Sequence, residues 1–450
     1  MILFKKLRFL VRFLVAVIKK QYRTVFLGLL LGVVFSICLP RIIKVLPQTR
    51  KTQKIGLIGQ YTVSGLPDEV LQDISYGLTR LDEKGEPQPA IAESWQTTND
   101  GKTYIFKLKK ISNAWHDGKP FAITDVNYNF KDVTLAINGD QMTFDLKEPF
   151  SPLPVILSRP LFKKGLIGLG DYRVKRIEKK GNFVKSILLV PQGGSSFFTD
   201  ENRLPNKLYR FYNNEKELKM AFNLGEIDVI KNLIDLESLY LGSSVEVTQN
   251  LMASAYLAVF LDTSRPPFGE KTFRQALAYA IPKPEGQGRA ISPLSPSSWA
   301  FNPDIKPYHQ DLDHAKKLLS QESPETKVKI TLSTFPQYEK IANEIRDSWQ
   351  QIGIEVTVQI VTFIPEEFDA LLIAREISRD PDQYYFWHST QLGNLSKFKS
   401  PRIDKLLEDG RKTLSREERK NIYYDFQRFL VEESPVIFLS HPVTYAIVRE

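Results

Sequence analysis

Residues 100–121, DGKTYIFKLKKISNAWHDGKPF, carry the most informative local pattern in this chain of 450 residues. Tyr104, Phe106 and Leu108 recur at every second position, which is the period of a half-buried β-strand. Asp–Gly pairs stand at 100–101 and 117–118, and such pairs are typical of tight turns because glycine tolerates positive φ. We therefore predict a strand bracketed by two turns, followed by a helix over residues 125–130 capped by Thr124.

His116 and Asp117 lie next to each other at the second turn, which raises the question of a catalytic acid–base pair. Neighbours in an extended segment point to opposite faces, so their side chains do not readily share a proton. An Asp–Gly turn explains both residues without any chemistry. We interpret His116 as a residue beside a turn.

Helix and strand patterns alternate along the rest of the chain. A helix capped by Asn214 is expected to end at Gly225. Strands over 327–335 and 354–361 flank a helix over 337–353, and strand–helix–strand units indicate α/β lobes with partly parallel sheets. Further segments have clear periodicity: a strand over 54–63, a helix from residue 68, and helices over 270–281 and 311–321.

The composition indicates a globular protein with a separate basic arm. At 42% hydrophobic and 25% charged residues, a chain of this length is expected to form two or more lobes. Residues 1–54 hold twelve of the 61 Lys and Arg residues and no acid, which leaves 49 basic against 52 acidic residues elsewhere. The near-neutral body argues against nucleic acid as a partner.

The basic arm surrounds an apolar run, TVFLGLLLGVVFSICL, over residues 24–39. Continued to residue 46, it reaches the roughly 20 residues that a spanning helix needs. We expect an interfacial arm over 1–23, a transmembrane helix over 24–46 and a linker over 47–54, with the body exported because basic residues dominate before the helix. Lipid attachment at Cys38, the only cysteine, is the alternative, although Ile37 is bulkier than such a signal requires.

Motifs of catalytic and metal sites are missing from the sequence. The five histidines are scattered, and together with one cysteine they predict no metal site. The run 165–170 lacks the glycine spacing of a phosphate-binding loop. Asp380 and Asp382 are interpreted first as part of a loop, with catalytic carboxylates as the alternative.

Residues 383–389, QYYFWHS, form the densest aromatic cluster. Strand alternation would place Tyr384, Phe386 and His388 on one face and Tyr385 and Trp387 on the other. A core strand explains this run, and stacking of Trp387 on a ligand is the alternative.

Residues 77–130 resemble the signature of family 5 of the extracellular solute-binding proteins, the peptide-binding class of ABC importers. The shared features are PAIAESW at 89–95, DGKTYIF at 100–106 and WHDGKPF at 115–121. Weaker matches follow in the family's order, among them LGEIDV at 224–229 and DPDQYYFWHS at 380–389. The resemblance covers about residues 55–450.

This resemblance implies an α/β, two-lobed fold of the periplasmic-binding-protein type (type II), with hinge strands between the lobes and the ligand bound between them. It implies lobe I over 55–262 and 441–450, with an inserted subdomain over 74–160, and lobe II over 263–440. Carried over by position, the candidate ligand-binding residues are Ser64, Gly65, Leu66, Tyr256, Arg375, Ile377, Ser378 and Trp387.

The chain departs from the family pattern at two important places. Residues 281–292 lack the usual acidic residue and the helix that follows it. In peptide-binding relatives an aspartate just ahead of the DPD-like loop pairs with the peptide's amino group. The matching positions here, Ile377 and Ser378, carry no Asp, which leaves Glu376 or Asp380 for that role.

The sequence thus predicts a single-pass protein of the cell membrane with an extracytoplasmic body, which captures peptides or a similar small solute by lobe closure for an ABC importer. The expected partners are the solute, a transporter permease and the membrane. We expect a monomer, not an enzyme, without cofactor, metal or nucleic acid. Two alternatives remain: a sensor or scaffold without transport, and a hydrolase that uses Asp380, Asp382 or His388.

Overall fold

The computed structural model describes residues 20, 21, 23, 50–110, 115–192, 204–321 and 328–449. The chain divides into two units, Met1–Lys51 and Thr52–Glu450, and the elements below belong to the second. The transmembrane helix expected over 24–46 lies outside the described residues, as does Cys38. Within the described part of the chain, no helix has the length and apolar content needed to cross a bilayer.

The first lobe is built on a seven-stranded mixed sheet in the order β12-β18-β11-β1-β10-β9-β8. The central strand β1 runs parallel to both of its neighbours, and the other pairs are antiparallel. Its strands are β1 (Thr52–Ile58), β8 (Tyr172–Lys180), β9 (Phe183–Pro191), β10 (Asn206–Tyr212), β11 (Val229–Leu233), β12 (Val245–Leu251) and β18 (Val443–Arg449).

Two helices, α3 (Asp68–Ile74) and α5 (Glu215–Asn223), pack against this sheet. Helix α5 begins and ends as predicted. The Asn214 side chain accepts a hydrogen bond from the Glu217 amide at 2.9 Å, and Gly225 follows the last turn with φ +73°.

Between α3 and β8 the chain forms a four-stranded antiparallel sheet, β4-β5-β7-β6, and a two-stranded ribbon, β2-β3. The predicted strand and its preceding turn are confirmed, because β5 follows a turn in which Asp100 and Gly101 have φ of +49° and +88°. The elements are β2 (Thr79–Leu81), β3 (Pro87–Pro89), β4 (Ala92–Thr98), β5 (Thr103–Leu108), β6 (Val133–Asn138), β7 (Gln141–Leu146) and the short helix α4 (Leu153–Ile156).

The turn interpretation of His116 is confirmed. The Gly118 amide donates to Trp115 O at 2.7 Å, and Gly118 has φ +79°. The Asp117 carboxylate accepts from the Lys119 amide at 3.1 Å, while His116 Nε2 lies 3.0 Å from Gly170 O. The two side chains therefore have different partners and form no dyad.

The prediction of a helix over residues 125–130 is wrong. A 3-10 turn, η3 (Ile123–Asp125), ends where that helix was expected to begin, and no helix follows it. The Asp125 carboxylate accepts from the Trp115 indole at 2.8 Å. Asn129 adopts φ +54°, and its amide donates to the Asn127 side chain at 2.7 Å. Such local bonds from Asp and Asn compete with helical hydrogen bonds, which explains why Thr124 caps no helix.

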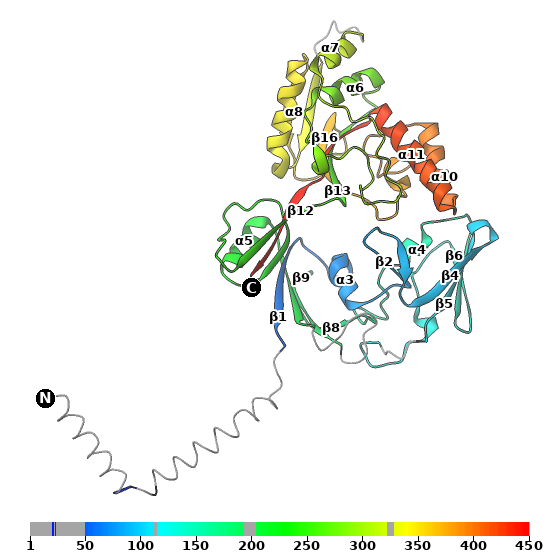
Figure 1. The fold of residues 1–450 in the computed structure, drawn as a ribbon, viewed down its shortest axis with the longest axis vertical. Coiled ribbons are helices and arrows are strands. Elements are labelled where there is room, and N and C mark those ends of the chain that lie inside the picture. Colours follow the sequence, from blue (N-terminus) through cyan, green and yellow to red (C-terminus); the bar gives the residue numbers. More distant parts are fainter. Residues whose placement is uncertain are drawn as a thin grey trace, which may run out of the picture. The chain divides into compact units, whose positions relative to one another are not determined.

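The second lobe has a five-stranded sheet in the order β15-β14-β16-β13-β17, in which β14 runs parallel to β15 and β16. Figure 1 shows this sheet between α8 on one side and α10 and α11 on the other. The strands are β13 (Ala255–Leu261), β14 (Lys329–Thr334), β15 (Glu355–Ile360), β16 (Ala370–Glu376) and β17 (Val436–Ser440). The helices are α6 (Lys271–Ala280), α7 (Leu312–Gln321), α8 (Glu339–Gln351), α9 (Tyr384–Trp387), α10 (Pro401–Lys412) and α11 (Arg416–Glu433).

The chain crosses between the two sheets twice, at residues 252–254 and at residues 441–442. The first crossing corrects the lobe boundary expected at residue 262, because β13 pairs with β16 and β17 and so belongs to the second sheet. All seven residues of β13 are buried. A continuous apolar run of this kind does not indicate which sheet the strand will join.

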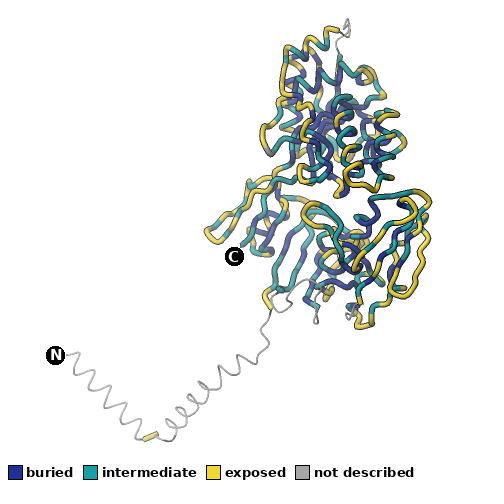
Figure 2. Tube along the Cα trace, turned by 45° about the vertical axis from the view of Figure 1, so that its right-hand side comes forward, coloured by how far each residue is buried: buried dark blue, intermediate teal, exposed yellow. Residues whose placement is uncertain are grey.

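Each lobe has its own hydrophobic core. Figure 2 shows buried residues in the interior of each lobe and exposed residues on the outside. The largest cluster surrounds β13 and includes Trp349, Phe260 and Trp387, each at most 1% exposed. A separate cluster under the four-stranded sheet contains Trp115 and Phe106, both fully buried.

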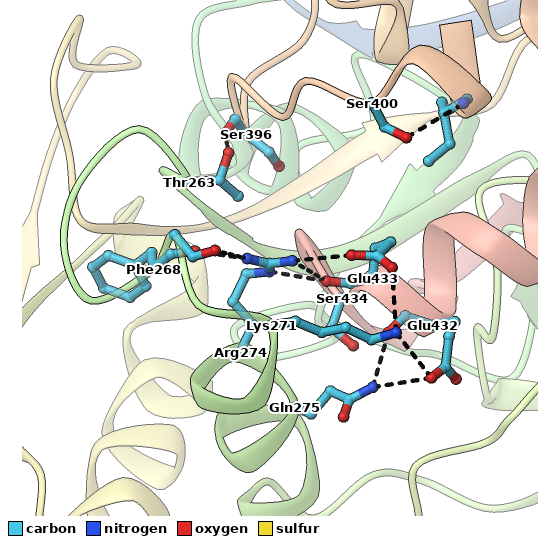
Figure 3. A network of polar contacts seen from close by, with 12 residues as sticks. Thr263, Phe268, Lys271, Arg274, Gln275, Ser396, Ser400, Glu432, Glu433 and Ser434 are labelled. Carbon is cyan, nitrogen blue, oxygen red and sulfur yellow. Dashed lines mark hydrogen bonds and ion pairs between the residues drawn. The ribbon is translucent and has the colours of Figure 1, made fainter. Parts of the chain in front are cut away.

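A polar network ties α6 to the end of α11 (Figure 3). The buried guanidinium of Arg274 donates from Nε and Nη2 to Glu433 O at 2.9 and 2.6 Å, and from Nη1 to Phe268 O at 2.9 Å. At the surface, Lys271 pairs with Glu432 and Glu433. Since these bonds join segments about 160 residues apart in sequence, they fix the helices of the second lobe against each other.

Candidate functional site

A cavity of about 260 Å³ lies between the four-stranded sheet of the first lobe and the helices of the second. The first lobe supplies the β2–β3 turn, one face of β4 and β5, and the start of α4. The second lobe supplies the loop after β16 and the start of α11. Residues of particular interest in its lining are Glu86, Trp95, Thr97, Tyr104, Trp299, Asp380, Arg416 and Arg419.

A buried ion pair forms part of the cavity wall. Arg419 is 6% exposed and Asp380 is 7% exposed, and Arg419 Nη1 donates to Asp380 Oδ2 at 3.0 Å while Nη2 donates to Oδ1. Burial alone would lower the pKa of Arg419, and the Asp380 charge more than reverses this, so the net shift is upward. Asp380 is thereby committed to Arg419 and is not free to hold a ligand's amino group.

Aromatic side chains from both lobes border the cavity. Trp95 stacks on Phe106 with a centroid distance of 5.7 Å, and the Tyr104 hydroxyl donates to Phe150 O at 3.0 Å. Burial raises the pKa of Tyr104 to about 12, although the nearby Arg419 charge opposes the shift. These aromatic rings present flat apolar surface, which suits contact with a small organic solute.

On the second lobe, Trp299 lies close to two cations. Its ring centroid is 5.3 Å from Cζ of Arg416 and 5.6 Å from Cζ of Arg419. Arg416 reaches across the cavity and pairs with Glu86 of the first lobe. The cavity thus has an aromatic and cationic side that belongs to the second lobe.

The two lobes touch each other at the rim of this cavity. The Ser151 amide donates to Arg411 O at 2.8 Å, and its hydroxyl donates to the same oxygen at 2.9 Å. Lys412 Nζ lies 3.7 Å from Glu148 Oε2, which adds an ion pair between the lobes. These bonds join the end of α10 to the loop before α4, so they are available only while the lobes are together.

The candidate residues of the first lobe follow β1. Ser64 and Gly65 are exposed in a 3-10 turn (Val63–Gly65), whereas Leu66 is 4% exposed and belongs to the core. Neighbouring Tyr61 has a raised pKa, first through burial and second through the charge of Glu376 on the second lobe.

Ile377 and Ser378 lie just past β16 and differ in exposure. The Ile377 amide donates to Ser254 O at 2.7 Å and its side chain is buried, whereas Ser378 is exposed. Glu376, next to them, is exposed as well. Of the two carboxylates that the sequence offers to an amino group, Glu376 is the one whose carboxylate accepts no hydrogen bond from the described residues.

The remaining candidates lie inside the second lobe. Tyr256 is 1% exposed and its ring meets Phe438 edge-on at 5.0 Å. Arg375 Cζ lies 4.0 Å from the ring centroid of Phe386, and Arg375 Nη2 donates to Gly393 O at 2.7 Å. These side chains support the loop after β16 from within the lobe.

Trp387 also packs in the core, and the strand predicted for residues 383–389 is wrong. The segment forms helix α9, because the Asp382 carboxylate accepts from the Tyr384 amide at 3.0 Å and Trp387 N donates to Gln383 O at 3.1 Å. Tyr384 and His388, four residues apart, stack with centroids 4.2 Å apart. The Trp387 ring is 1% exposed, so it presents no surface to a cleft in this conformation.

The groups proposed for a hydrolase all have structural partners. Asp382 Oδ2 accepts from Nε and Nη2 of Arg411, each at 3.0 Å. His388 Nδ1 lies 2.8 Å from Thr390 Oγ1, and its Nε2 lies 3.4 Å from Glu408. Among the described residues, no cluster of His, Cys, Asp and Glu has the geometry to hold a metal ion.

Apart from Asp380, sequence reasoning missed the residues that line the cavity. Trp95 and Tyr104 stand inside the motifs PAIAESW and DGKTYIF, which the sequence analysis used only as signs of the family and of a strand. Arg416 and Arg419 lie three residues apart at the start of α11, a spacing that places them on one helix face. The sequence offered this local signal but no means of pairing Arg419 with Asp380.

Known proteins resemble this chain in sequence and in fold. Residues 86–396 match the family described as bacterial extracellular solute-binding proteins, family 5. The oligopeptide-binding protein AppA of Bacillus subtilis is 24% identical, covering 90% of this chain and 88% of that protein. The dipeptide-binding protein of Escherichia coli is 22% identical, covering 80% of this chain and 82% of that protein.

Solved structures agree with this assignment at the level of the fold. AppA from Bacillus subtilis in complex with a nonapeptide superposes with a TM-score of 0.69 at 22% identity, covering 90% of this chain and 95% of that one. NikZ from Campylobacter jejuni in complex with Ni(L-His) superposes with a TM-score of 0.74 at 21% identity. This comparison covers 90% of this chain and 95% of that one. The two-lobed mixed α/β fold is therefore shared. The family resemblance stated from the sequence is confirmed, and the chain belongs to family 5 of the bacterial extracellular solute-binding proteins.

Proposed function

We propose that this chain is the extracytoplasmic solute-binding component of an ABC importer, and that it holds a peptide or a similar small solute in the cavity between its lobes. The observation that carries this proposal is the cavity of about 260 Å³ with walls from both lobes and direct bonds between the lobes at its rim. The names of the Bacillus subtilis and Escherichia coli relatives, which are oligopeptide- and dipeptide-binding proteins, support the class of solute.

The mechanism is closure about the two crossings at residues 252–254 and 441–442. A solute that contacts both lobes binds the closed form more tightly than the open form and so shifts the population toward closure. Trp95 and Tyr104 of the first lobe and Trp299 of the second supply the apolar contact. Glu376 lies outside the lining of this cavity and supplies a negative charge for the amino group of a peptide that extends beyond it, since Asp380 is taken by Arg419.

The proposed residues of the ligand site are therefore revised from those expected by position. Ser64, Gly65 and Ser378 are retained because they are exposed, and Glu376, which the sequence offers in place of the missing aspartate, is added. Leu66, Tyr256, Arg375, Ile377 and Trp387 become supporting residues of the two cores.

We further propose that residues 24–46 anchor the protein in the cell membrane as a single span, with residues 1–23 on the cytoplasmic side. The apolar content of residues 24–39 and the basic residues around them support this. Carbonate washing of membranes tests it, together with mass determination of the mature N-terminus. Retention of Met1 in the washed membrane is expected, and a lipid-bearing N-terminus at Cys38 would overturn it.

The solute is identified by offering the full chain, in detergent, a mixed peptide digest and analysing both the bound and the free fraction by mass spectrometry. A solute-binding protein enriches a subset of peptides and leaves the free pool uncleaved. Cleavage products that accumulate with time would favour the hydrolase instead. Retention without uptake in cells that carry a matching permease would favour the sensor.

A further inference from the structure

Two cations, Lys283 and Arg289, lie on the loop that follows α6, and neither lines the interlobe cavity. Lys283 Nζ donates to three carbonyl oxygens, those of Ala278, Ile281 and Tyr308, the last at 2.8 Å. Arg289 Nη1 donates to the carbonyl oxygens of Phe438 and Leu439 at 2.7 and 2.9 Å, and its Nη2 donates to Pro307 O at 2.8 Å. Every partner in this set is a neutral carbonyl.

Neither cation has an acidic partner among the described residues, although both are partly buried. Burial and the adjacent Arg289 charge lower the pKa of Lys283 from 10.5 to about 7, and burial lowers the pKa of Arg289 to about 10. No carboxylate offsets either shift. Burying two positive charges without a counter-ion raises the free energy of the folded protein. A bound anion lowers it again, because it pairs with both charges.

Both side chains line a cavity of about 1330 Å³, formed by the second lobe, the adjoining crossing segment and the end of β12. Its walls include the apolar side chains of Leu251, Ile291 and Phe301. Glu285 is the one acid among the lining residues, and it is exposed. The cavity thus combines a cationic end with apolar walls.

The guanidinium of Arg289 retains donors for a ligand. Its five N–H groups meet four carbonyl oxygens, three on Nη1 and one on Nη2, and no described group accepts from Nε. The edge formed by Nε and Nη2 is the one that a carboxylate binds side-on through two parallel bonds.

We propose that the cavity beside Lys283 and Arg289 binds a small organic carboxylate with an apolar group, at a site separate from the interlobe cavity. The carboxylate pairs with the Nε–Nη2 edge of Arg289, and Lys283 adds a second positive charge. The apolar group packs on Ile291 and Phe301. Peptide capture between the lobes is independent of this site, so either proposal can fail without the other.

Phenylacetate is the probe, and 2-phenylethanol is its neutral counterpart with the same ring. The full chain in detergent is treated with formaldehyde and cyanoborohydride, and methylation of each lysine is followed by peptide mass mapping. Phenylacetate is expected to slow methylation of Lys283 while Lys340, an exposed lysine of α8, is unaffected. Unchanged labelling of Lys283 at saturating phenylacetate would overturn the proposal, as would equal protection by 2-phenylethanol.

Two variants locate the site. Arg289→Gln is expected to weaken phenylacetate binding about tenfold, the loss of one charge-assisted interaction. Ser297→Trp places a ring in the cavity mouth from an exposed position and is expected to block the probe while both cations stay. Lys340→Met is the matched control and should bind phenylacetate normally. Protection by inorganic phosphate but not by phenylacetate would show an anion site without the apolar requirement and so contradict the ligand class.

Discussion

Gly85 at the tip of the β2–β3 turn lies against the backbone of Arg379 in the other lobe: a Cβ on Gly85 would stand 2.9 Å from Arg379 O. Gly85 also has φ +78°. We predict that Gly85→Ala shifts the protein toward the open form and weakens solute binding, because the added methyl group separates two backbones that meet only on closure. Fluorescence energy transfer between dyes at Asp132→Cys and Glu417→Cys, in a Cys38→Ser background, measures the opening.

Gly139→Ala is the matched control for that substitution. Gly139 occupies the β6–β7 turn with φ +61°, and nothing lies within 4 Å of its Cβ position. Both substitutions carry the backbone strain of alanine at positive φ, about 1 kcal/mol. If Gly139→Ala opens the lobes as much as Gly85→Ala does, the contact with Arg379 is not the cause.

The ion pair between Arg419 and Asp380 is expected to dominate the stability of the cavity wall. Arg419→Gln should lower the free energy of unfolding by about 3–5 kcal/mol, because it leaves the Asp380 carboxylate buried without a partner. The double variant Asp380→Asn, Arg419→Gln should recover part of this loss. Denaturant titration checks both, and an additive double variant would contradict the coupling.

Arg416 provides the exposed comparison on the same helix. Its pairing with Glu86 joins the lobes but is largely exposed to solvent. Arg416→Gln is expected to change stability by no more than about 1 kcal/mol. A stability loss as large as that of Arg419→Gln would show that burial does not distinguish the two arginines.

Trp387 and Trp95 are expected to separate core packing from solute contact. Trp387→Ala should destabilise the unliganded protein by about 3–5 kcal/mol, since the ring is 1% exposed and stacks on Phe260. Trp95→Ala should instead weaken solute binding by about 1–3 kcal/mol, because Trp95 is partly exposed at the cavity. Melting temperatures without solute and affinities from calorimetry check the pair. If Trp387→Ala weakens solute binding and Trp95→Ala lowers stability instead, the solute does not bind in the interlobe cavity.

The pKa of Lys283 predicts how stability depends on pH. Since the folded protein holds this pKa near 7 and the unfolded chain returns it to 10.5, the unfolded state binds more protons between these values. Stability contributed by this residue therefore rises with pH across that window, at up to about 1.4 kcal/mol per pH unit. Lys283→Met should remove this rise, as measured by denaturant titration at pH 7, 8.5 and 10. Identical slopes for the two proteins would contradict the depressed pKa.

Local patterns were sufficient to predict many elements of the fold. Asn214 and Gly225 delimit α5 through hydrogen bonds and a positive φ that lie within one turn of the helix. The β14–α8–β15 unit follows from periodicity alone. Residues 383–389 misled the prediction because short aromatic runs do not reveal a helical turn, and the turn follows a local bond from the Tyr384 amide to the Asp382 carboxylate.

Long-range pairing explains what the sequence could not predict. Asp380 and Arg419 are 39 positions apart, and neither residue indicates the other. The fully apolar strand β13 gave no sign that it joins the second sheet. Trp299 lies in a loop rich in proline and serine, and only the folded chain brings it close to Arg416 and Arg419.

The account's central claim is that an intact solute is held in the interlobe cavity. A photo-reactive amino acid placed at Thr97, which lines the cavity, tests it directly, with Thr134 on the exposed face of β6 as the control position. After illumination with a mixed peptide digest, the adduct masses are determined. We predict that position 97 captures uncleaved peptides and position 134 does not. Equal capture at both positions, or capture of cleaved products alone, would contradict the account.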